Sequence, residues 1–382
     1  MNPSVSILAL AVILVAPAKL FAAAPANSSA LLQPFVDRHE LAGAVTAVVD
    51  KDKVRSVETV GFADIAGRKA MKADAIFWIA SQTKPMTATA VMMLVDEGKV
   101  ALNDALEKYL PEFRGQMVTL EKDDAHTVLR KPAHPITLRQ VLNHTSGMPF
   151  QSTLETPTHD IVPLSALVRS YAITPLVSEP GTSYLYSSAG INIAGRIIEV
   201  VSGMSYEDFM EQRLFKPLGM HDTTFWPNEK QSRRVAKSYR PDATKTNLSE
   251  FKIVQLAYPL SDRTHRFPIP AGGLFSTAHD TARFCQMLLN RGVLNGRRYV
   301  SESAFVELTK RQTPAAMKES YGLCFAVGPD WFGHGGAQAT SMEIRPNNGI
   351  ATVWMVQHAG FPGEGGKAQG VFKAWALERF GN

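Results

Sequence analysis

The chain has 382 residues, of which 45% are apolar and 20% charged, enough to bury a large core in one domain or two intimate subdomains. Its formal charge of +5 is mild and its Lys and Arg residues are spread along the sequence, which argues against nucleic-acid binding. Only Cys285 and Cys324 occur, with no clustered Cys/His ligand set, so the sequence predicts neither a disulfide framework nor a metal site.

The N-terminus is typical of a secretory signal peptide. The apolar run Val5–Pro17 has signal-peptide length, and the small residues Ala22–Ala24 suit a signal peptidase. No Lys or Arg precedes the run and Lys19 follows it, so an uncleaved anchor or a buried first helix stays open as the alternative. We predict a signal peptide at 1–24 and an exported protein, periplasmic or secreted, without a stable membrane anchor.

The first elements after this leader are two strands, a strand end and a long helix. Alternating apolar residues predict strands at Gly43–Val49 and Val54–Val60, around a polar turn. The short apolar strand end Phe77–Ala80 follows, and then a helix from Gln82 to Glu97. Within it, Ala88–Val95 is apolar nearly all round, so we expect this helix in the centre of the domain.

Helical patterns dominate the middle of the chain and strands return near its end. From 102 to 269 the pattern is mostly helical, broken by Pro- and Gly-rich connections. Strands at both ends with helices between them predict an α/β protein of the α+β type, whose sheet is assembled from both termini around an inserted helical region. The later elements expected are the helix Ala278–Asn290, the strands Tyr321–Val327, Ala339–Arg345 and Ile350–His358, and the helix Val371–Phe380.

Ser81 and Lys84 form the first candidate catalytic pair. Three residues apart on a helix, they lie on the same face, so the amine reaches the hydroxyl. A serine hydroxyl needs a partner to take its proton, and a buried lysine becomes that partner when desolvation lowers its pKa. The same spacing recurs at Ser249–Lys252 in a polar stretch without an apolar helix, so context rather than spacing selects the first pair.

Two further segments carry candidate site residues. Tyr186–Ser188 precedes a helical run, and a tyrosine near a lysine acts as general base and then as general acid; the alternative is a ring that merely packs at the start of the helix. In Gly333–Gly336 the glycines indicate close approach of a ligand to the backbone, and His334 donates to an anionic group or relays a proton. A simple turn between strands is the alternative there.

In this order, the three features resemble the β-lactamase and penicillin-binding serine hydrolase superfamily over nearly the whole chain. Ser81–Lys84 is similar to its Ser-x-x-Lys nucleophile motif, Tyr186–Ser188 to its Tyr-x-Asn motif, and His334–Gly336 to its Lys-Thr-Gly motif in the His-x-Gly form. The stretches 138–149 and 271–277 resemble the class C-related branch. There they mainly shape the scaffold around the cleft, which makes a structural role the interpretation for His144.

The resemblance implies an antiparallel sheet flanked by helices plus an all-helical subdomain. We expect a single serine hydrolase domain at 25–382, with an α/β subdomain at about 28–100 and 271–382 and a helical subdomain at about 101–270.

The resemblance also implies a reaction without metal or organic cofactor on a small-molecule acyl substrate. Ser81 attacks a carbonyl, Lys84 and Tyr186 manage its proton, and water activated through Tyr186 releases the acyl group. The implied oxyanion hole is made by the backbone N–H groups of Ser81 and Ala337, and the implied substrate-binding residues are His334, Gly335, Gly336 and Ser188.

Two departures from the superfamily pattern bear on the substrate. Ser188 stands where the motif has Asn, and His334 replaces the Lys whose permanent charge meets the carboxylate of a β-lactam. With an unperturbed pKa of about 6.5, His334 would bind acidic substrates more tightly as the pH falls. Both changes favour ester or small amide hydrolysis, as in family VIII carboxylesterases, over a β-lactamase or a D-Ala-D-Ala carboxypeptidase-like penicillin-binding protein. An acylated β-lactam sensor without turnover is the alternative of another class, and the oligomeric state is not predicted.

Overall fold

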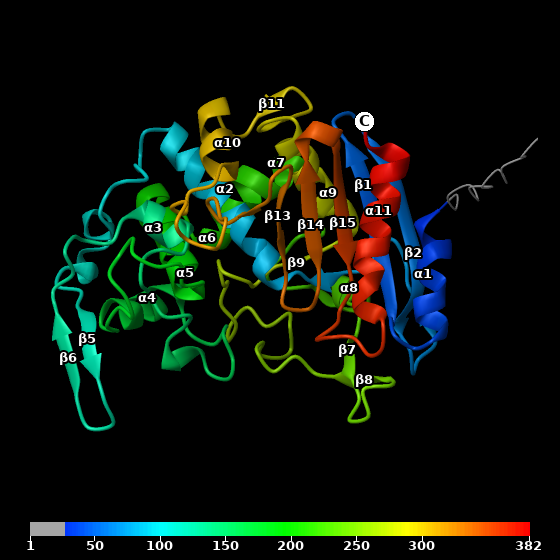
Figure 1. Ribbon diagram of the computed structural model, residues 1–382, viewed down its shortest axis with the longest axis horizontal. Coiled ribbons are helices and arrows are strands. Elements are labelled where there is room, and N and C mark those ends of the chain that lie inside the picture. Colours follow the sequence, from blue (N-terminus) through cyan, green and yellow to red (C-terminus); the bar gives the residue numbers. More distant parts are fainter. Residues whose placement is uncertain (1–26) are drawn as a thin grey trace, which may run out of the picture.

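The computed structural model describes residues 27–382, so the signal peptide expected at 1–24 lies outside them. Its centre is a seven-stranded sheet in the order β12-β13-β14-β15-β1-β2-β3, in which every neighbouring pair is antiparallel (Figure 1). The sheet is built from both ends of the chain, as predicted. Its strands are β1 (Gly43–Asp50), β2 (Val54–Asp64), β3 (Lys69–Ala70), β12 (Ala326–Val327), β13 (Phe332–Gly335), β14 (Ser341–Arg345) and β15 (Ile350–Met355).

Strand β1 shows why the sheet holds together at its middle. Successive side chains of a strand point to opposite faces. Val45, Ala47 and Val49 therefore pack into the main core, while Ala44 and Val48 pack into the core on the other face. Because both faces of the sheet are covered, the sequence of this strand is almost entirely apolar.

Helices cover both faces of the sheet (Figure 1). α1 (Ser28–Asp37) and α11 (Ala368–Phe380) pack on one face, where Trp354 of β15 contacts the ring of Phe372. α9 (Ala278–Leu289) contributes to the main core on the opposite face. The sheet is therefore the middle layer of three.

The long central helix is confirmed with a small shift of its start. A 3-10 turn, Ala80–Gln82, comes first, and α2 then runs over Thr83–Asp96. All residues from Thr83 to Leu94 are buried. The apolar character of this segment thus reflects burial on every side of the helix.

The inserted segment is not all-helical, which corrects the expectation for 101–270. Two hairpins lie in it, β5–β6 (Val118–Lys122 and Thr127–Arg130) and β7–β8 (Ser238–Pro241 and Leu248–Phe251). The side chains of β5, β6 and β8 are largely solvated, whereas Ser238 and Tyr239 of β7 are buried. The solvated strands lack the apolar alternation that marks a strand on a core. The helices of this segment are α3 (Leu138–Leu142), α4 (Leu164–Ala172), α5 (Ser188–Ser202), α6 (Tyr206–Phe209), α7 (Lys216–Leu218) and α8 (Glu229–Ser232), with a π-helical turn at Met210–Phe215.

The C-terminal strands are shorter than the apolar runs that predicted them. Strand β12 covers only the last residues of the expected 321–327, and β14 begins two residues later than expected. Cys324 and Ala339 have φ values of 61° and 62°, which are incompatible with a strand, so each interrupts the pattern. The remaining elements are β4 (Phe77–Trp78), β9 (Phe275–Ser276), β10 (Val293–Leu294), β11 (Arg297–Arg298), α10 (Glu302–Thr309) and the 3-10 turns Leu106–Lys108, Pro111–Phe113, Thr153–Glu155, Pro346–Asn348 and Gly365–Lys367.

Two properties of the described residues complete the fold. Within 27–382, no helix combines the length and apolarity needed to span a bilayer. Cys285 and Cys324 are both buried and both free, so they pack as small apolar side chains.

Candidate active site

Ser81 sits where a strand end turns into the central helix. β4 pairs with β9, and Ile79 N–H donates to Leu274 O at 2.9 Å, which ties the chain before Ser81 to the stretch 271–277. The next residue, Ala80, has a φ of 44°, an uncommon conformation for a residue with a side chain. Such local strain persists only when the surrounding structure enforces it, and it is frequent at functional sites.

The amine of Lys84 lies against the Ser81 hydroxyl. Its Nζ is 3.0 Å from Ser81 Oγ and 2.6 Å from the carbonyl oxygen of Ala271. The side chain is completely buried. Burial lowers the pKa of Lys84 to about 7, although Cys324 and Glu155 act in the opposite direction. A neutral amine is thus accessible beside the hydroxyl near neutral pH.

Tyr186 completes the cluster from the segment just before α5. Its ring centroid lies 4.9 Å from Lys84 Nζ. Burial raises the pKa of Tyr186 above its usual range, and a hydrogen bond with Ser81 lowers it in part. The structure therefore brings together the three residues predicted to be catalytic, although they come from two segments about a hundred positions apart.

His144 holds the segment that carries Tyr186. It is fully buried, and its Nδ1 accepts from Ser187 N–H at 3.2 Å. Its ring centroid lies 4.4 Å from that of Tyr186, and burial keeps its pKa well below the usual value. A neutral ring that supports the tyrosine from behind agrees with the structural role inferred for this residue.

A chain of buried hydrogen bonds reaches Lys84 from the helical side. The Ala271 carbonyl accepts from Lys84, and the Ala271 N–H donates to Asn192 Oδ1 at 3.0 Å. Asn192 Nδ2 in turn donates to Tyr171 Oη at 2.9 Å and to Glu155 Oε1 at 3.3 Å. Burial raises the pKa of Glu155. These contacts fix the Ala271 carbonyl, and through it the position of the amine.

Close backbone packing lets residue 271 reach Lys84. A Cβ on Gly195 of α5 would lie 2.2 Å from Cγ of Pro270, a separation that no side chain tolerates. Glycine at this position therefore permits α5 to approach the segment that carries Ala271.

The end of the C-terminal strand β13 lies close to the chain just before Ser81. A Cβ on Gly336 would lie 2.4 Å from the carbonyl oxygen of Ile79, so this glycine allows β13 to pack against the chain just before the nucleophile. At Gly335 the nearest atom to such a Cβ is Thr340 O at 3.4 Å. Ala337 follows on the exposed turn, and its N–H has no partner within residues 27–382.

His334 is placed differently from the expectation for a carboxylate-binding residue. Its Nδ1 donates to Gly335 O at 2.6 Å, and the Tyr321 hydroxyl donates to its Nε2 at 2.9 Å. Burial and the charge of Lys84 lower the pKa of His334 to about 4, not the value of about 6.5 expected for an unperturbed ring. Both ring nitrogens are engaged and the ring is neutral at neutral pH.

A cavity of about 400 Å³ opens beside Ser81. Ser81, Ser188 and Ala337 line it, together with Glu155, whereas His334, Gly335 and Gly336 do not. Of the four predicted substrate-binding residues, only Ser188 therefore borders this cavity. Its apolar wall consists of Trp78, Ala80, Phe150, Pro157, Val254, Leu256, Ile269 and Ala271.

Three residues of the site carried too weak a sequence signal to be found. Asn192 stands out only as a polar residue in the otherwise apolar start of α5, and that contrast could have singled it out. Glu155 lies in a short 3-10 turn, and Tyr321 just before a strand of two residues, without a motif around either. In the part of the chain that the structure describes, no group of three or more His, Cys, Asp or Glu side chains is arranged to hold a metal ion.

The chain is similar to penicillin-binding proteins and esterases. Penicillin-binding protein 4 of Amycolatopsis lactamdurans is 30% identical over 297 residues, covering 74% of this chain and 72% of that protein. The lovastatin esterase of Penicillium rubens is 30% identical over 221 residues, or 53% of each chain. The solved structure of EstCE1, a hydrolase with promiscuous acyltransferase activity, superposes with a TM-score of 0.75 at 20% identity, covering 91% of this chain and 97% of that one.

The match extends to the family as a whole. The β-lactamase family model covers residues 29–373, nearly everything that the structure describes, and the superposition with EstCE1 shows the same fold. Members of this family are generally serine hydrolases and include penicillin-binding proteins, carboxypeptidases and esterases. The chain belongs to the β-lactamase family.

Proposed function

We propose that the protein is a serine hydrolase that forms an acyl-enzyme on Ser81 and acts on uncharged esters or small amides. The observation that carries this proposal is the amine of Lys84. It is completely buried, lies 3.0 Å from Ser81 Oγ and has a pKa of about 7. A nucleophile with a neutral base in contact is what acyl transfer requires.

In the proposed reaction, Lys84 is the base and Tyr186 the proton donor. At neutral pH a large fraction of Lys84 is unprotonated, so it takes the Ser81 proton as the hydroxyl attacks the substrate carbonyl. The phenol of Tyr186 keeps its proton because burial raises its pKa, and it donates to the leaving group. In the second half of the reaction Tyr186 and Lys84 activate the water that releases the acyl group.

The oxyanion of the tetrahedral intermediate is assigned to two backbone N–H groups. Ser81 and Ala337 border the same cavity, and backbone donors there are oriented before the reaction begins. The apolar wall contributed by Phe150, Val254 and Leu256 suits an acyl group of moderate size.

The preference for uncharged substrates follows from His334. A β-lactam or a D-alanyl peptide carries a carboxylate, for which this region of the site would need a cation. His334 is neutral above a pH of about 4 and both its nitrogens are engaged within the protein. The likeness to a lovastatin esterase supports an ester substrate.

Two other functions compete with this one. A β-lactamase or D-Ala-D-Ala carboxypeptidase activity is favoured by the likeness to penicillin-binding protein 4, which covers more of the chain than the esterase. An acylated sensor without turnover would share Ser81 and Lys84 but would keep its acyl group.

Turnover of two chromogenic substrates separates these functions. We expect p-nitrophenyl butyrate to be hydrolysed faster than nitrocefin, and Ser81→Ala to abolish both activities. Faster turnover of nitrocefin by several orders of magnitude would replace the esterase assignment with a β-lactamase. Intact-protein mass spectrometry after mixing with penicillin tests the sensor, since a label on Ser81 that never clears identifies it.

Export is a second part of the proposal, based on the leader-like sequence at 1–24. Expression of the full chain in a bacterial host, followed by fractionation and N-terminal sequencing, tests it. A mature N-terminus near Ala24 in the periplasm or medium supports export, and a full-length protein in the cytoplasm contradicts it.

A further inference from the structure

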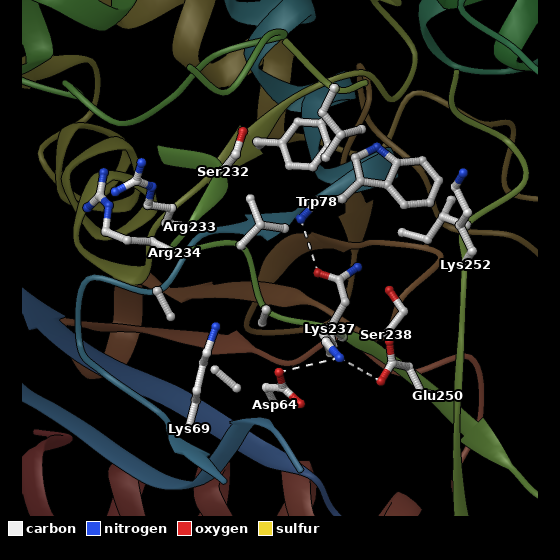
Figure 2. A pocket seen from close by; sticks show the side chains of 18 of the residues that line it. Asp64, Lys69, Trp78, Ser232, Arg233, Arg234, Lys237, Ser238, Glu250 and Lys252 are labelled. Atoms are coloured by element: carbon white, nitrogen blue, oxygen red, sulfur yellow. Dashed lines mark hydrogen bonds and ion pairs between the residues drawn. The ribbon is translucent and has the colours of Figure 1, made fainter. Parts of the chain in front are cut away.

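A second cavity, about twice as large, adjoins the catalytic one. Its volume is about 820 Å³, against about 400 Å³ beside Ser81. It opens between the ends of β2 and β3, the segment 232–238 and the β7–β8 hairpin (Figure 2). Trp78 and Leu256 line both cavities, so they form a wall that the two share.

The floor of this second cavity is apolar and contains one unmet hydrogen-bond donor. Trp78, Leu256 and Phe275 are buried and belong to one apolar cluster. Gln357, only 3% exposed, also lines the cavity, and its Oε1 accepts from Trp78 N–H at 3.0 Å. Its Nε2 has no partner within residues 27–382. Buried amide groups are rarely left without a partner, and this one belongs to a residue of the cavity wall.

The rim of the cavity is basic. Six Lys or Arg side chains line it against three Asp or Glu side chains. Lys237 pairs with both Asp64 and Glu250, as Figure 2 shows, and Arg234 pairs with Asp74 and with Asp222 outside the cavity. The acidic groups of the cavity are therefore already used by these two cations.

Three of the lysines remain without a counter-ion. Lys69, Lys72 and Lys252 line the cavity and make no ion pair within residues 27–382. Lys252 places its Nζ 4.0 Å from the ring centroid of Tyr258. An apolar floor below unpaired ammonium groups attracts a molecule with an apolar body and an acidic group.

We infer that this cavity binds a small amphipathic monoanion, such as an aromatic carboxylate or sulfonate. The apolar body rests on Trp78 and Phe275, and the acidic group lies at the rim lysines. This binding does not depend on the reactivity of Ser81, because none of these residues forms a bond or moves a proton in the proposed reaction, although Trp78 also borders the catalytic cavity.

The dye anilinonaphthalene sulfonate is the probe, and phenylnaphthylamine, which shares its aromatic body without the acid, is the matched neutral control. We expect the sulfonate to bind with one-to-one stoichiometry and at least about tenfold more tightly than the neutral dye. Equal affinity of the two dyes would overturn the proposal, because it would show that the lysines contribute nothing.

Two sets of variants locate the site. The triple variant Lys69→Gln, Lys72→Gln, Lys252→Gln should lose about tenfold in affinity for the sulfonate. A triple variant with the same charge change at exposed lysines elsewhere, Lys53→Gln, Lys122→Gln, Lys318→Gln, should lose far less. If both triple variants lost the same affinity, the effect would come from net charge alone, which would contradict a specific site.

A filling variant separates this cavity from the catalytic one. Ala70 lines the second cavity at its exposed edge, so Ala70→Trp occupies space there without disturbing the core. We expect it to abolish binding of the sulfonate while hydrolysis of p-nitrophenyl butyrate continues. Unchanged dye binding in a folded variant would place the dye elsewhere and overturn the proposal.

Discussion

Lys84 and Arg266 are both almost completely buried, at 0% and 2% exposure, yet their surroundings differ in one respect. Arg266 donates from Nε to Asp160 Oδ2 at 2.7 Å, and Asp160 is itself 1% exposed. Arg266 also bonds the carbonyl oxygens of Phe225 and Leu260. A buried cation with a full set of partners fixes the chain around it.

Lys84, by contrast, contacts only neutral oxygens, the Ser81 hydroxyl and the Ala271 carbonyl. Without a carboxylate in contact, burial shifts its pKa to about 7. Burial alone therefore does not define a catalytic cation. What matters is whether the protein supplies the opposite charge that would hold the proton in place.

Replacing Lys84 should give the largest effect on activity. We expect Lys84→Met to lower kcat for p-nitrophenyl butyrate by roughly 10³-fold, since general-base catalysis contributes about 10²- to 10⁴-fold. At the same time the variant should be more stable than the wild type at pH 7, because an unpaired buried amine is replaced by an apolar side chain of similar volume. Steady-state kinetics and urea unfolding measure the two effects.

The stability gain has a defined pH dependence. The folded pKa of Lys84 is about 7 and the unfolded one about 10.4. Between these values the unfolded chain binds more protons, so the free energy of unfolding of the wild type rises with pH, by up to about 1.4 kcal/mol per unit from this residue. The advantage of Lys84→Met should therefore be constant below pH 7 and shrink towards pH 10. A difference that does not change with pH would contradict the shifted pKa.

Replacing Arg266 should have the opposite effect. Arg266→Met leaves Asp160 buried and unpaired, which costs about 3–5 kcal/mol of stability. The double variant Arg266→Met, Asp160→Leu removes both charges and should recover much of that loss. Equal unfolding free energies for the single variant and the wild type would remove the distinction between the two cations.

The next prediction concerns the series of buried hydrogen bonds that ends at Lys84. Asn192→Leu deprives the Ala271 N–H and Glu155 of their partner, at a cost of about 1–3 kcal/mol in stability. Because the Ala271 carbonyl then loses its support, kcat should also fall, by roughly tenfold, a loss of about 1.4 kcal/mol in transition-state stabilisation. A purely structural asparagine would lower stability and leave kcat and the pH–rate profile of the folded enzyme unchanged.

The two glycines of the C-terminal strand form a matched pair. A methyl group on Gly336 would collide with the Ile79 carbonyl, whereas one on Gly335 would meet its first neighbour only at 3.4 Å. We expect Gly336→Ala to lose about 1–3 kcal/mol of stability and part of the activity, and Gly335→Ala to lose much less. Similar losses in thermal unfolding would show that β13 does not approach Ser81 as closely as described.

The smallest effect is expected from His334 on the pH–rate profile. The acid limb of kcat/KM should lie near pH 7, because Lys84 must be neutral to act as base. His334 titrates at about 4, so His334→Gln should leave that limb in place. If the acid limb of kcat/KM moved by a full pH unit in this variant, Lys84 would not be the general base.

Much of the fold could be predicted because its signals are local. The apolar run of α2 indicates a central helix wherever it packs, and strands near both termini indicate a sheet built from both ends. The sequence does not indicate the hairpins of the inserted segment, because the exposed strands β5, β6 and β8 carry no apolar alternation. Cys324 and Ala339 shortened two strands through left-handed φ values, which side-chain pattern does not reveal.

At the site, local sequence is enough to give the residue types and their spacing: a serine and a lysine one helical turn apart, a tyrosine before a helix, and a histidine among glycines. The charge states of these side chains follow from the folded structure. Segments that arrive from residues 186 and 271 bury the amine of Lys84, and this burial lowers its pKa to about 7. His334 is engaged by Tyr321 rather than left free for a substrate. A pKa depends on desolvation and on neighbouring charges, and both are set by contacts between distant parts of the chain.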